Sequence, residues 1–172
     1  SSDFKMPPEI AALIPDVEAA LEADGIDGLK KIAPHVASLR RITGLAKVNP
    51  VSEWIKDQLD GGMRKLVVFA HHREVLSALT VDAARHGFDY ACITGDTTNR
   101  QAEVDRFQNI GACRLFFGQI QAAGTGITLT AASDCVLVES DWTPANNEQA
   151  VMRIHRVGQN SACLVRVATL AG

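Results

Sequence analysis

The chain has 172 residues, 47% of them hydrophobic, and a formal net charge of −3 at pH 7. This length predicts one folded domain with a short addition, and the hydrophobic fraction excludes an intrinsically disordered chain. A domain that grips nucleic acid unaided is usually basic, so the charge either excludes a nucleic-acid partner or leaves this chain with only part of a larger groove.

The apolar runs of the sequence are too short to cross a bilayer, and its N-terminus lacks the basic-then-apolar order of a signal peptide. We therefore expect no membrane partner. The cysteines form no C-x-x-C pair, and each lies in or beside an apolar run, which favours reduced thiols over disulfides or metal ligands. We expect no metal site and a cytoplasmic location, nucleoid-associated if the protein is bacterial. These cysteines are Cys92, Cys113, Cys135 and Cys163.

The N-terminal part of the chain is rich in Pro, Ala and Asp and has weak hydrophobic periodicity. We predict a helical or irregular lead-in over residues 1–48 and a folded domain over residues 49–172. Asn49 and Pro50 predict the N-cap and first position of a helix. Gly61 and Gly62 then predict its end.

After this helix, short apolar runs alternate with helical segments. Continuously apolar strands that are each followed by a helix indicate a parallel sheet covered on both faces. In the middle of the alternation, Thr98 and Gln101 predict a capping box. The fold class is therefore α/β, a doubly wound parallel sheet with an N-terminal helical appendage. The predicted strands cover residues 66–70, 91–94, 113–117, 135–139 and 164–168, and the predicted helices cover residues 74–86, 98–108 and 144–157.

Residues 141–159 read DWTPANNEQAVMRIHRVGQ and place Gln149, Arg153 and Arg156 four and three positions apart. On one helix, these spacings bring the side chains to the same face. A guanidinium carries a permanent charge and a planar fork of donors that matches phosphate oxygens. Two forks beside an amide suit the charge that develops on a transferring phosphoryl group.

Plainer interpretations of these residues remain open. The two arginines could lie on a solvated helix face, and Arg153 could form an ion pair with Glu148 or Asp141. His155 is expected to point elsewhere on the helix and to pack, and Trp142 is expected to be a core or lobe-positioning aromatic rather than a base-stacking platform.

Residues 141–159 also resemble the last conserved motif of the Swi/Snf family of helicase-like ATPases, which begins D-W-x-P and continues Q-x-x-x-R-x-x-R-x-G-Q. Three earlier segments follow the order of that family: KLVVFAHH at 65–72, TGDT at 94–97 with an Arg-Gln pair at 100–101, and QAAGTGITLTAAS at 121–133. The double histidine of the first segment resembles the branch that contains the annealing helicases. The second and third segments depart from the family pattern at Thr94, Asp96, Ala123 and Thr128.

The resemblance implies the C-terminal RecA-like lobe of a DNA-dependent ATPase or translocase. In such motors, ATP and Mg²⁺ lie between two lobes and are held mainly by the N-terminal RecA-like lobe of the same protein. The present sequence contains no G-x-x-x-x-G-K-[ST] motif and no D-E-x-H or D-E-x-D run. We therefore expect the chain to be part of a larger protein and to be inactive by itself.

The family pattern also assigns roles to residues of this lobe. Arg153 and Arg156 are the expected arginine fingers, oriented through Gln149. The expected nucleotide-binding residues are Gly124, Gly126 and Gln159. Double-stranded or forked DNA is the expected partner, and the candidate contacts are His71, Thr97, Gln121 and Thr128.

Two other functions remain open on the sequence. The chain could be a non-catalytic α/β module that binds a nucleotide or a protein. It could also be the C-lobe of another superfamily-two helicase, although such lobes usually carry an H-R-x-G-R run.

Overall fold

The computed structural model describes residues 33–34, 36–123 and 126–170. The chain divides into two compact units, Ser1–Ala46 and Lys47–Gly172. In the first unit, residues 33–34 and 36–46 are helical, and the Thr43 hydroxyl donates to the Arg40 carbonyl at 2.9 Å within that helix. Residues 1–32 and 35 of the predicted lead-in lie outside the described residues.

The second unit contains a sheet of five parallel strands in the order β2-β3-β1-β4-β5. All five residues of the central strand β1 are buried, which explains its unbroken run of Leu, Val, Phe and Ala. The predicted parallel sheet is confirmed. The strands are β1 Leu66–Ala70, β2 Asp89–Ile93, β3 Cys113–Gln119, β4 Asp134–Leu137 and β5 Leu164–Val167.

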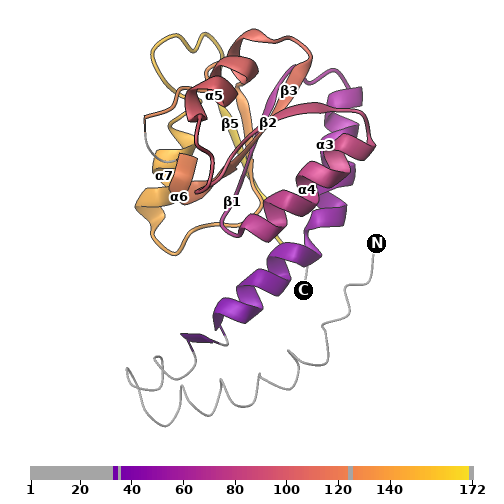
Figure 1. Cartoon of the computed structure of the whole chain (residues 1–172), viewed down its shortest axis with the longest axis vertical. Helices are drawn as coiled ribbons and strands as arrows, with labels where there is room; N and C mark the ends of the chain where they lie inside the picture. The colour runs from indigo at the N-terminus through magenta and orange to yellow at the C-terminus, as the bar shows by residue number, and fades with distance from the viewer. Residues whose placement is uncertain (1–32, 35, 124–125, 171–172) are drawn as a thin grey trace. The chain divides into compact units, whose positions relative to one another are not determined.

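Helices cover both faces of this sheet, as a doubly wound fold requires (Figure 1). Two of them, α3 and α4, lie on one face, and α5, α6 and α7 lie on the other. The predicted α/β fold class is therefore confirmed. The helices are α3 Val48–Asp60, α4 Arg73–Arg85, α5 Arg100–Asn109, α6 Ile120–Ala123 and α7 Pro144–Val151. None of the helices in the described ranges is both long and apolar enough to span a membrane.

The core on the α5–α7 face is built by alternate residues of the strands. Val67 and Phe69 of β1 belong to one buried cluster with Phe107 of α5 and with Ile154, which follows α7. Successive strand residues point to opposite faces, so one strand supplies both layers of core. Because Ile154 is fully buried, this core also fixes the chain segment after α7.

Two predicted helix starts are wrong. α3 begins at Val48 rather than after an Asn49 cap, because Val48 is buried and the Val51 N–H donates to the Lys47 carbonyl at 3.0 Å. α5 has Asn99 as its N-cap, whose side-chain oxygen accepts from the Ala102 N–H at 3.1 Å. The Thr98 capping box therefore does not form.

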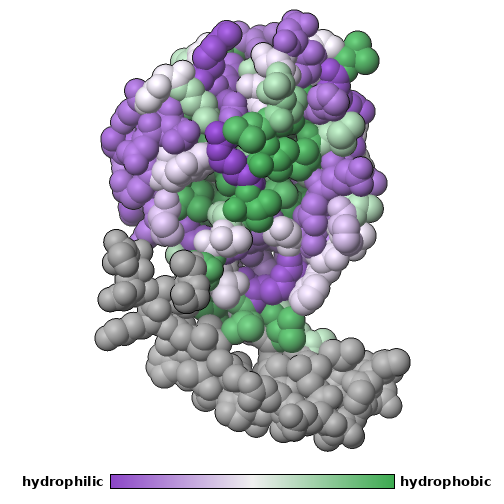
Figure 2. Space-filling view, turned by 180° about the vertical axis from the view of Figure 1, so that it is seen from behind, coloured by the Kyte–Doolittle hydropathy of each residue, from purple (hydrophilic) through white to green (hydrophobic). Residues whose placement is uncertain are grey.

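The edge strand β5 is largely exposed. Its residues Leu164, Val165 and Val167 are 49%, 38% and 56% exposed, unlike the buried apolar residues of β1. Figure 2 shows hydrophobic residues gathered on one face of the molecule and surrounded by hydrophilic ones. Among the described residues of the second unit, the exposed side chains of β5 leave that edge of the sheet incompletely covered.

The parallel arrangement brings several chain segments to one edge of the sheet. The residues that follow β1, β3 and β4 all leave the sheet at the carboxyl ends of the strands. Ligands of doubly wound folds bind at that edge. The segments that follow these three strands carry most of the predicted site residues.

Candidate functional site: an arginine pocket along α7 and the turn after it

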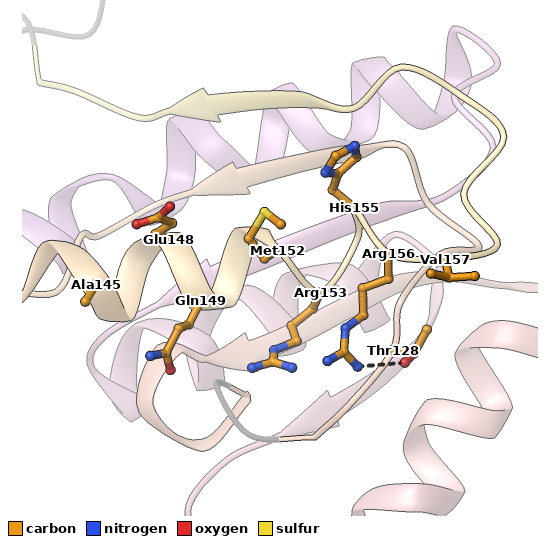
Figure 3. Close-up of a pocket in the computed structure, with 9 residues that line it drawn as sticks. All are labelled: Thr128, Ala145, Glu148, Gln149, Met152, Arg153, His155, Arg156 and Val157. Atoms are coloured by element: carbon orange, nitrogen blue, oxygen red, sulfur yellow. Dashed lines mark hydrogen bonds between the residues drawn. The ribbon is translucent and has the colours of Figure 1, made fainter.

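An open pocket of about 860 Å³ lies against α7 and the turn that follows it. Gln149, Arg153 and Arg156 all line it, so the structure brings the three predicted catalytic residues together. Figure 3 shows their side chains extending to the same side, whereas Glu148 and His155 point to the opposite side. This arrangement concentrates two guanidiniums and one amide on a single surface.

The helix that was predicted to carry all three residues is shorter than expected. α7 ends at Val151, so only Gln149 lies on it. The N–H groups of Arg153 and Ile154 donate to carbonyls three residues earlier, at 3.1 Å each, which is the pattern of a tight turn rather than an α-helix. The prediction of one helix over residues 144–157 is therefore wrong, although the shared face is preserved.

Contacts from other elements explain why the helix ends early. The Arg153 carbonyl accepts from the Leu129 N–H at 2.8 Å, and the Ile154 carbonyl accepts from Gln159 Nε2 at 3.1 Å. Both carbonyls thus have partners outside a regular helix, and Ile154 is drawn into the core. Periodicity in the sequence reports the apolar face of this segment, but it does not report these competing hydrogen bonds.

The two arginines differ in their surroundings. Arg153 is partly buried, and burial together with the nearby charge of Arg156 lowers its pKa. Arg156 is exposed and donates from Nη1 to Thr128 Oγ1 at 3.1 Å and to the Ile127 carbonyl at 3.3 Å (Figure 3). An anion placed between two neighbouring guanidiniums would relieve their mutual repulsion, which suits a phosphate group.

Gln159 lies just beyond the pocket residues. Its Nε2 donates to the carbonyls of Thr130, Ala132 and Ile154 at 3.3, 2.8 and 3.1 Å, and its Oε1 accepts from the Ser161 N–H at 3.0 Å. The amide therefore binds the backbone of the loop after α6 to the turn that carries the arginines.

The predicted glycine loop is only partly described. Gly126 has a φ of 74°, a backbone conformation that favours glycine. Gly124 lies outside the described residues.

A second group of polar residues lies where β1 and β4 end. Glu139 and Asp141 are only 6% and 8% exposed. His72 Nδ1 lies 2.7 Å from Glu139 Oε1, while Glu139 Oε2 accepts from the N–H groups of His71 and His72 at 3.2 and 2.9 Å. One buried carboxylate thus fixes the backbone at the end of β1.

Asp141 organises the other half of this group. His71 Nδ1 lies 3.1 Å from its Oδ2, and Gln121 Nε2 donates to the same oxygen at 3.4 Å. Burial opposes ionisation of Asp141, but the Thr143 N–H and the side chains of Asn146, His71 and Gln121 outweigh it and lower the pKa of this carboxyl. Two predicted DNA contacts, His71 and Gln121, therefore meet at one ionised carboxylate.

The other two predicted DNA contacts lie in neighbouring loops. Thr97 Oγ1 accepts from the Thr94 N–H at 2.9 Å, within the turn after β2. Gln119 joins that turn to β1, because its Oε1 accepts from the Gly95 N–H at 3.1 Å and its Nε2 donates to the His71 carbonyl at 3.2 Å. Thr128 contacts Arg156 instead. The four candidates therefore form no single cluster.

The two buried acids are not among the functional candidates predicted from the sequence. A signal exists, since Glu139 directly follows an apolar strand segment and Asp141 lies two residues later, where a buried acid needs a dedicated partner. The described residues contain no group of three or more His, Cys, Asp or Glu side chains that could hold a metal ion.

Two aromatic residues near α7 are exposed. Trp142 is 67% exposed, so it is not a core residue, and its other expected role, as a lobe-positioning aromatic, stays a prediction. His155 points away from the arginines, as expected, but it is exposed rather than packed. Trp142 precedes α7 and His155 follows it. In this part of the chain, the buried residues are Ala150 and Ile154.

Comparison with known proteins identifies the family. The profile of the helicase conserved C-terminal domain matches residues 47–158. The chain is 32% identical to the DNA annealing helicase and endonuclease ZRANB3 of Mus musculus over 92% of its own length and 15% of that protein. It is 33% identical to a SWI/SNF-related matrix-associated actin-dependent regulator of chromatin subfamily A-like protein 1 homolog of Caenorhabditis elegans, over 92% of the chain and 24% of that relative.

Solved structures agree on the fold. The Sulfolobus solfataricus SWI2/SNF2 ATPase core in complex with double-stranded DNA superposes with a TM-score of 0.71 at 20% identity, covering 94% of this chain and 38% of that one. The C-terminal part of the Fun30 ATPase domain superposes with a TM-score of 0.65 at 24% identity, covering 70% and 40% of the respective chains. The chain spans less than a quarter of the length of the two curated relatives, 15% and 24%. It belongs to the helicase conserved C-terminal domain family, as a C-terminal lobe of the Swi/Snf-related type.

Proposed function

We propose that the chain is the C-terminal motor lobe of a DNA-dependent ATPase or translocase and that Arg153 and Arg156 act as its arginine fingers. The observation that carries this proposal is the shared orientation of Gln149, Arg153 and Arg156 in one open pocket (Figure 3). A supplied arginine stabilises the charge of a phosphoryl-transfer transition state. Family membership adds a reason to expect nucleotide hydrolysis, because the curated relatives include annealing helicases.

The nucleotide and its Mg²⁺ would be held mainly by an N-terminal RecA-like lobe of the same protein. The present sequence has no phosphate-loop motif, so this chain supplies only one wall of such a cleft. The pocket is open to solvent in the described residues, as expected of a surface that meets a second lobe.

Duplex or forked DNA is the proposed polymer partner. His71, Thr97 and Thr128 lie outside helices and strands, Gln121 lies on α6, and all four side chains offer donors to phosphates. Such contacts fix position along DNA without reading its sequence. The net charge of −3 agrees with a lobe that forms only part of the groove. In support, one structure with the same fold is a complex with double-stranded DNA.

Substitution of the arginines in the full two-lobe protein tests the proposal. We expect Arg156→Ala and Arg153→Ala each to lower DNA-stimulated ATP hydrolysis by roughly three orders of magnitude, because a finger of this kind contributes a thousandfold or more to phosphoryl transfer. Arg156→Lys should not restore the rate, since lysine keeps the charge but lacks the planar fork. The measurement is steady-state phosphate release with saturating ATP and DNA.

His155→Ala is the matched control, because His155 lines the same pocket but points to the opposite side. Its rate should remain close to that of the unmodified protein, and circular dichroism should show that all variants fold. Undiminished hydrolysis in both Arg153→Ala and Arg156→Ala would rule out the finger assignment.

A further inference from the structure

Asp141 is bonded to three separate parts of the lobe. Its Oδ1 accepts from the Thr143 N–H at 2.9 Å and from Asn146 Nδ2 at 3.2 Å, which ties it to the start of α7. Its Oδ2 faces His71 Nδ1, at the end of β1, and Gln121 Nε2, on α6. The two carboxylate oxygens therefore serve different elements.

The backbone of Asp141 strengthens the bond to α7. Its N–H donates to Asn147 Oδ1 at 2.7 Å, and its carbonyl accepts from Asn147 Nδ2 at 2.9 Å. Because Asp141 is 8% exposed and an ionised carboxylate accepts but never donates, each of its side-chain neighbours must present a hydrogen to it. His71 is thereby held with its proton on Nδ1.

The helix that Asp141 holds leads directly to the arginine pocket. Ala145, Glu148 and Gln149 of α7 line that pocket, and the turn with Arg153 follows. A displacement of the α7 start relative to β1 or α6 would therefore also move the α7 residues that line the pocket.

We propose that Asp141 is a positioning residue that couples DNA contact at His71 and Gln121 to the placement of Gln149 and Arg153. This inference rests on the proposed function, in which His71 and Gln121 face DNA. Gln121 is exposed, and its bond to Asp141 is, at 3.4 Å, the longest hydrogen bond of that carboxylate. A phosphate that accepts from the Gln121 amide draws that amide away from Asp141 Oδ2. Asp141 then keeps only its hydrogen bonds to His71 and to the start of α7.

The test compares rates of ATP hydrolysis with and without saturating duplex DNA in the full two-lobe protein. Asp141→Ser keeps a short hydroxyl that can accept from the Thr143 N–H, as serine does in turns, but it has no second oxygen to meet His71 and Gln121. We expect Asp141→Ser to lower the DNA stimulation ratio about tenfold, which lies within the usual range of coupling between two sites. The rate without DNA should fall by a smaller factor.

A double-substitution cycle separates coupling from general damage. Gln121→Leu removes the other end of the same hydrogen bond from an exposed position, and we expect it to lower the stimulation ratio as well. If both residues act through this bond, the double variant has the same stimulation ratio as Asp141→Ser. If they act independently, the two factors by which the ratio falls multiply. Asp134→Ser is the matched control, because Asp134 is also a partly buried carboxylate. It lies on β4 and is paired with Arg166 of β5 at 2.7 Å.

Each outcome decides the inference. A stimulation ratio in Asp141→Ser within about twofold of the unmodified protein overturns it, as does multiplication in the double variant. An unmodified protein without any DNA stimulation overturns the proposed function and this inference together. If Asp141→Ser fails to fold, Gln121→Leu decides: an unchanged ratio contradicts the coupling, and a lowered ratio with unchanged circular dichroism and unchanged DNA affinity supports it.

Discussion

Thr128 shows how one hydroxyl can belong to two sites. Its oxygen accepts from Arg156, the expected finger, and a hydroxyl that accepts one bond still has a hydrogen to donate. The sequence pattern places Thr128 among the expected DNA contacts and Arg156 among the expected catalytic residues. The hydrogen bond between them means that these two assignments cannot be tested independently by removing Thr128 alone.

Gln159 gives a prediction at the same scale. Replacing it by Leu removes the amide that donates to three backbone carbonyls and should lower the free energy of unfolding by about 1–3 kcal/mol, the usual range for buried groups left unsatisfied. Urea denaturation followed by circular dichroism measures this difference. Asn160→Ala, at the exposed neighbouring position, should change it by less than about 0.5 kcal/mol. Equal stability of the two variants would contradict the structural role of the amide.

At the level of elements, the strands were far easier to predict than the helix ends. An unbroken apolar run such as 66–70 marks a buried strand because no polar side chain could be accommodated on either face. The start of α5 depended on a choice between Thr98 and Asn99, two neighbouring residues that can both cap a helix. The end of α7 depended on Leu129 and Gln159, which contact it only in the folded chain.

The site residues also divide into those that a local sequence pattern predicts and those that only contacts in the folded chain bring together. Regular spacing placed Gln149, Arg153 and Arg156 on one surface, and this grouping survived even though the helix between them did not continue. Asp141 and Glu139 escaped because their importance comes from partners about 20 and 70 positions away in sequence. Pairing across a parallel sheet brings such residues together, and no local pattern reports it.

The close approach of β3 to β1 gives a prediction for an element pair. A Cβ on Gly118 would lie 2.9 Å from Phe69 Cε1 and 3.2 Å from Ala123 Cβ of α6. Gly118→Ala should therefore lower the free energy of unfolding by roughly 1–3 kcal/mol, as overpacking of a core usually does. Gly111→Ala is the matched control, because nothing lies within 4 Å of the added atom. A Gly118→Ala variant with an unchanged urea midpoint would show that Phe69 moves freely at this contact.

On the scale of the whole molecule, a lobe with one wall of a nucleotide cleft should bind nucleotide weakly by itself. We expect the 172-residue chain to bind ATP with a dissociation constant in the millimolar range or weaker, corresponding to about 4 kcal/mol or less. Isothermal titration calorimetry with ATP and Mg²⁺ provides the measurement. Micromolar binding would instead favour the alternative of a self-sufficient nucleotide-binding module.

The strand order has a consequence for synthesis of the chain. The central strand β1 leaves the ribosome first, but its neighbours in the sheet are β3 and β4, so Leu66 pairs with Leu115 and Asp134. The segment LVVFA must therefore wait, unpaired and apolar, while roughly another 50 residues are made before β3 follows, which at about 5–20 residues per second takes several seconds. During that interval α4 and β2 have no sheet to join. The nascent chain is thus most exposed to aggregation, and most dependent on chaperones, just before β3 emerges.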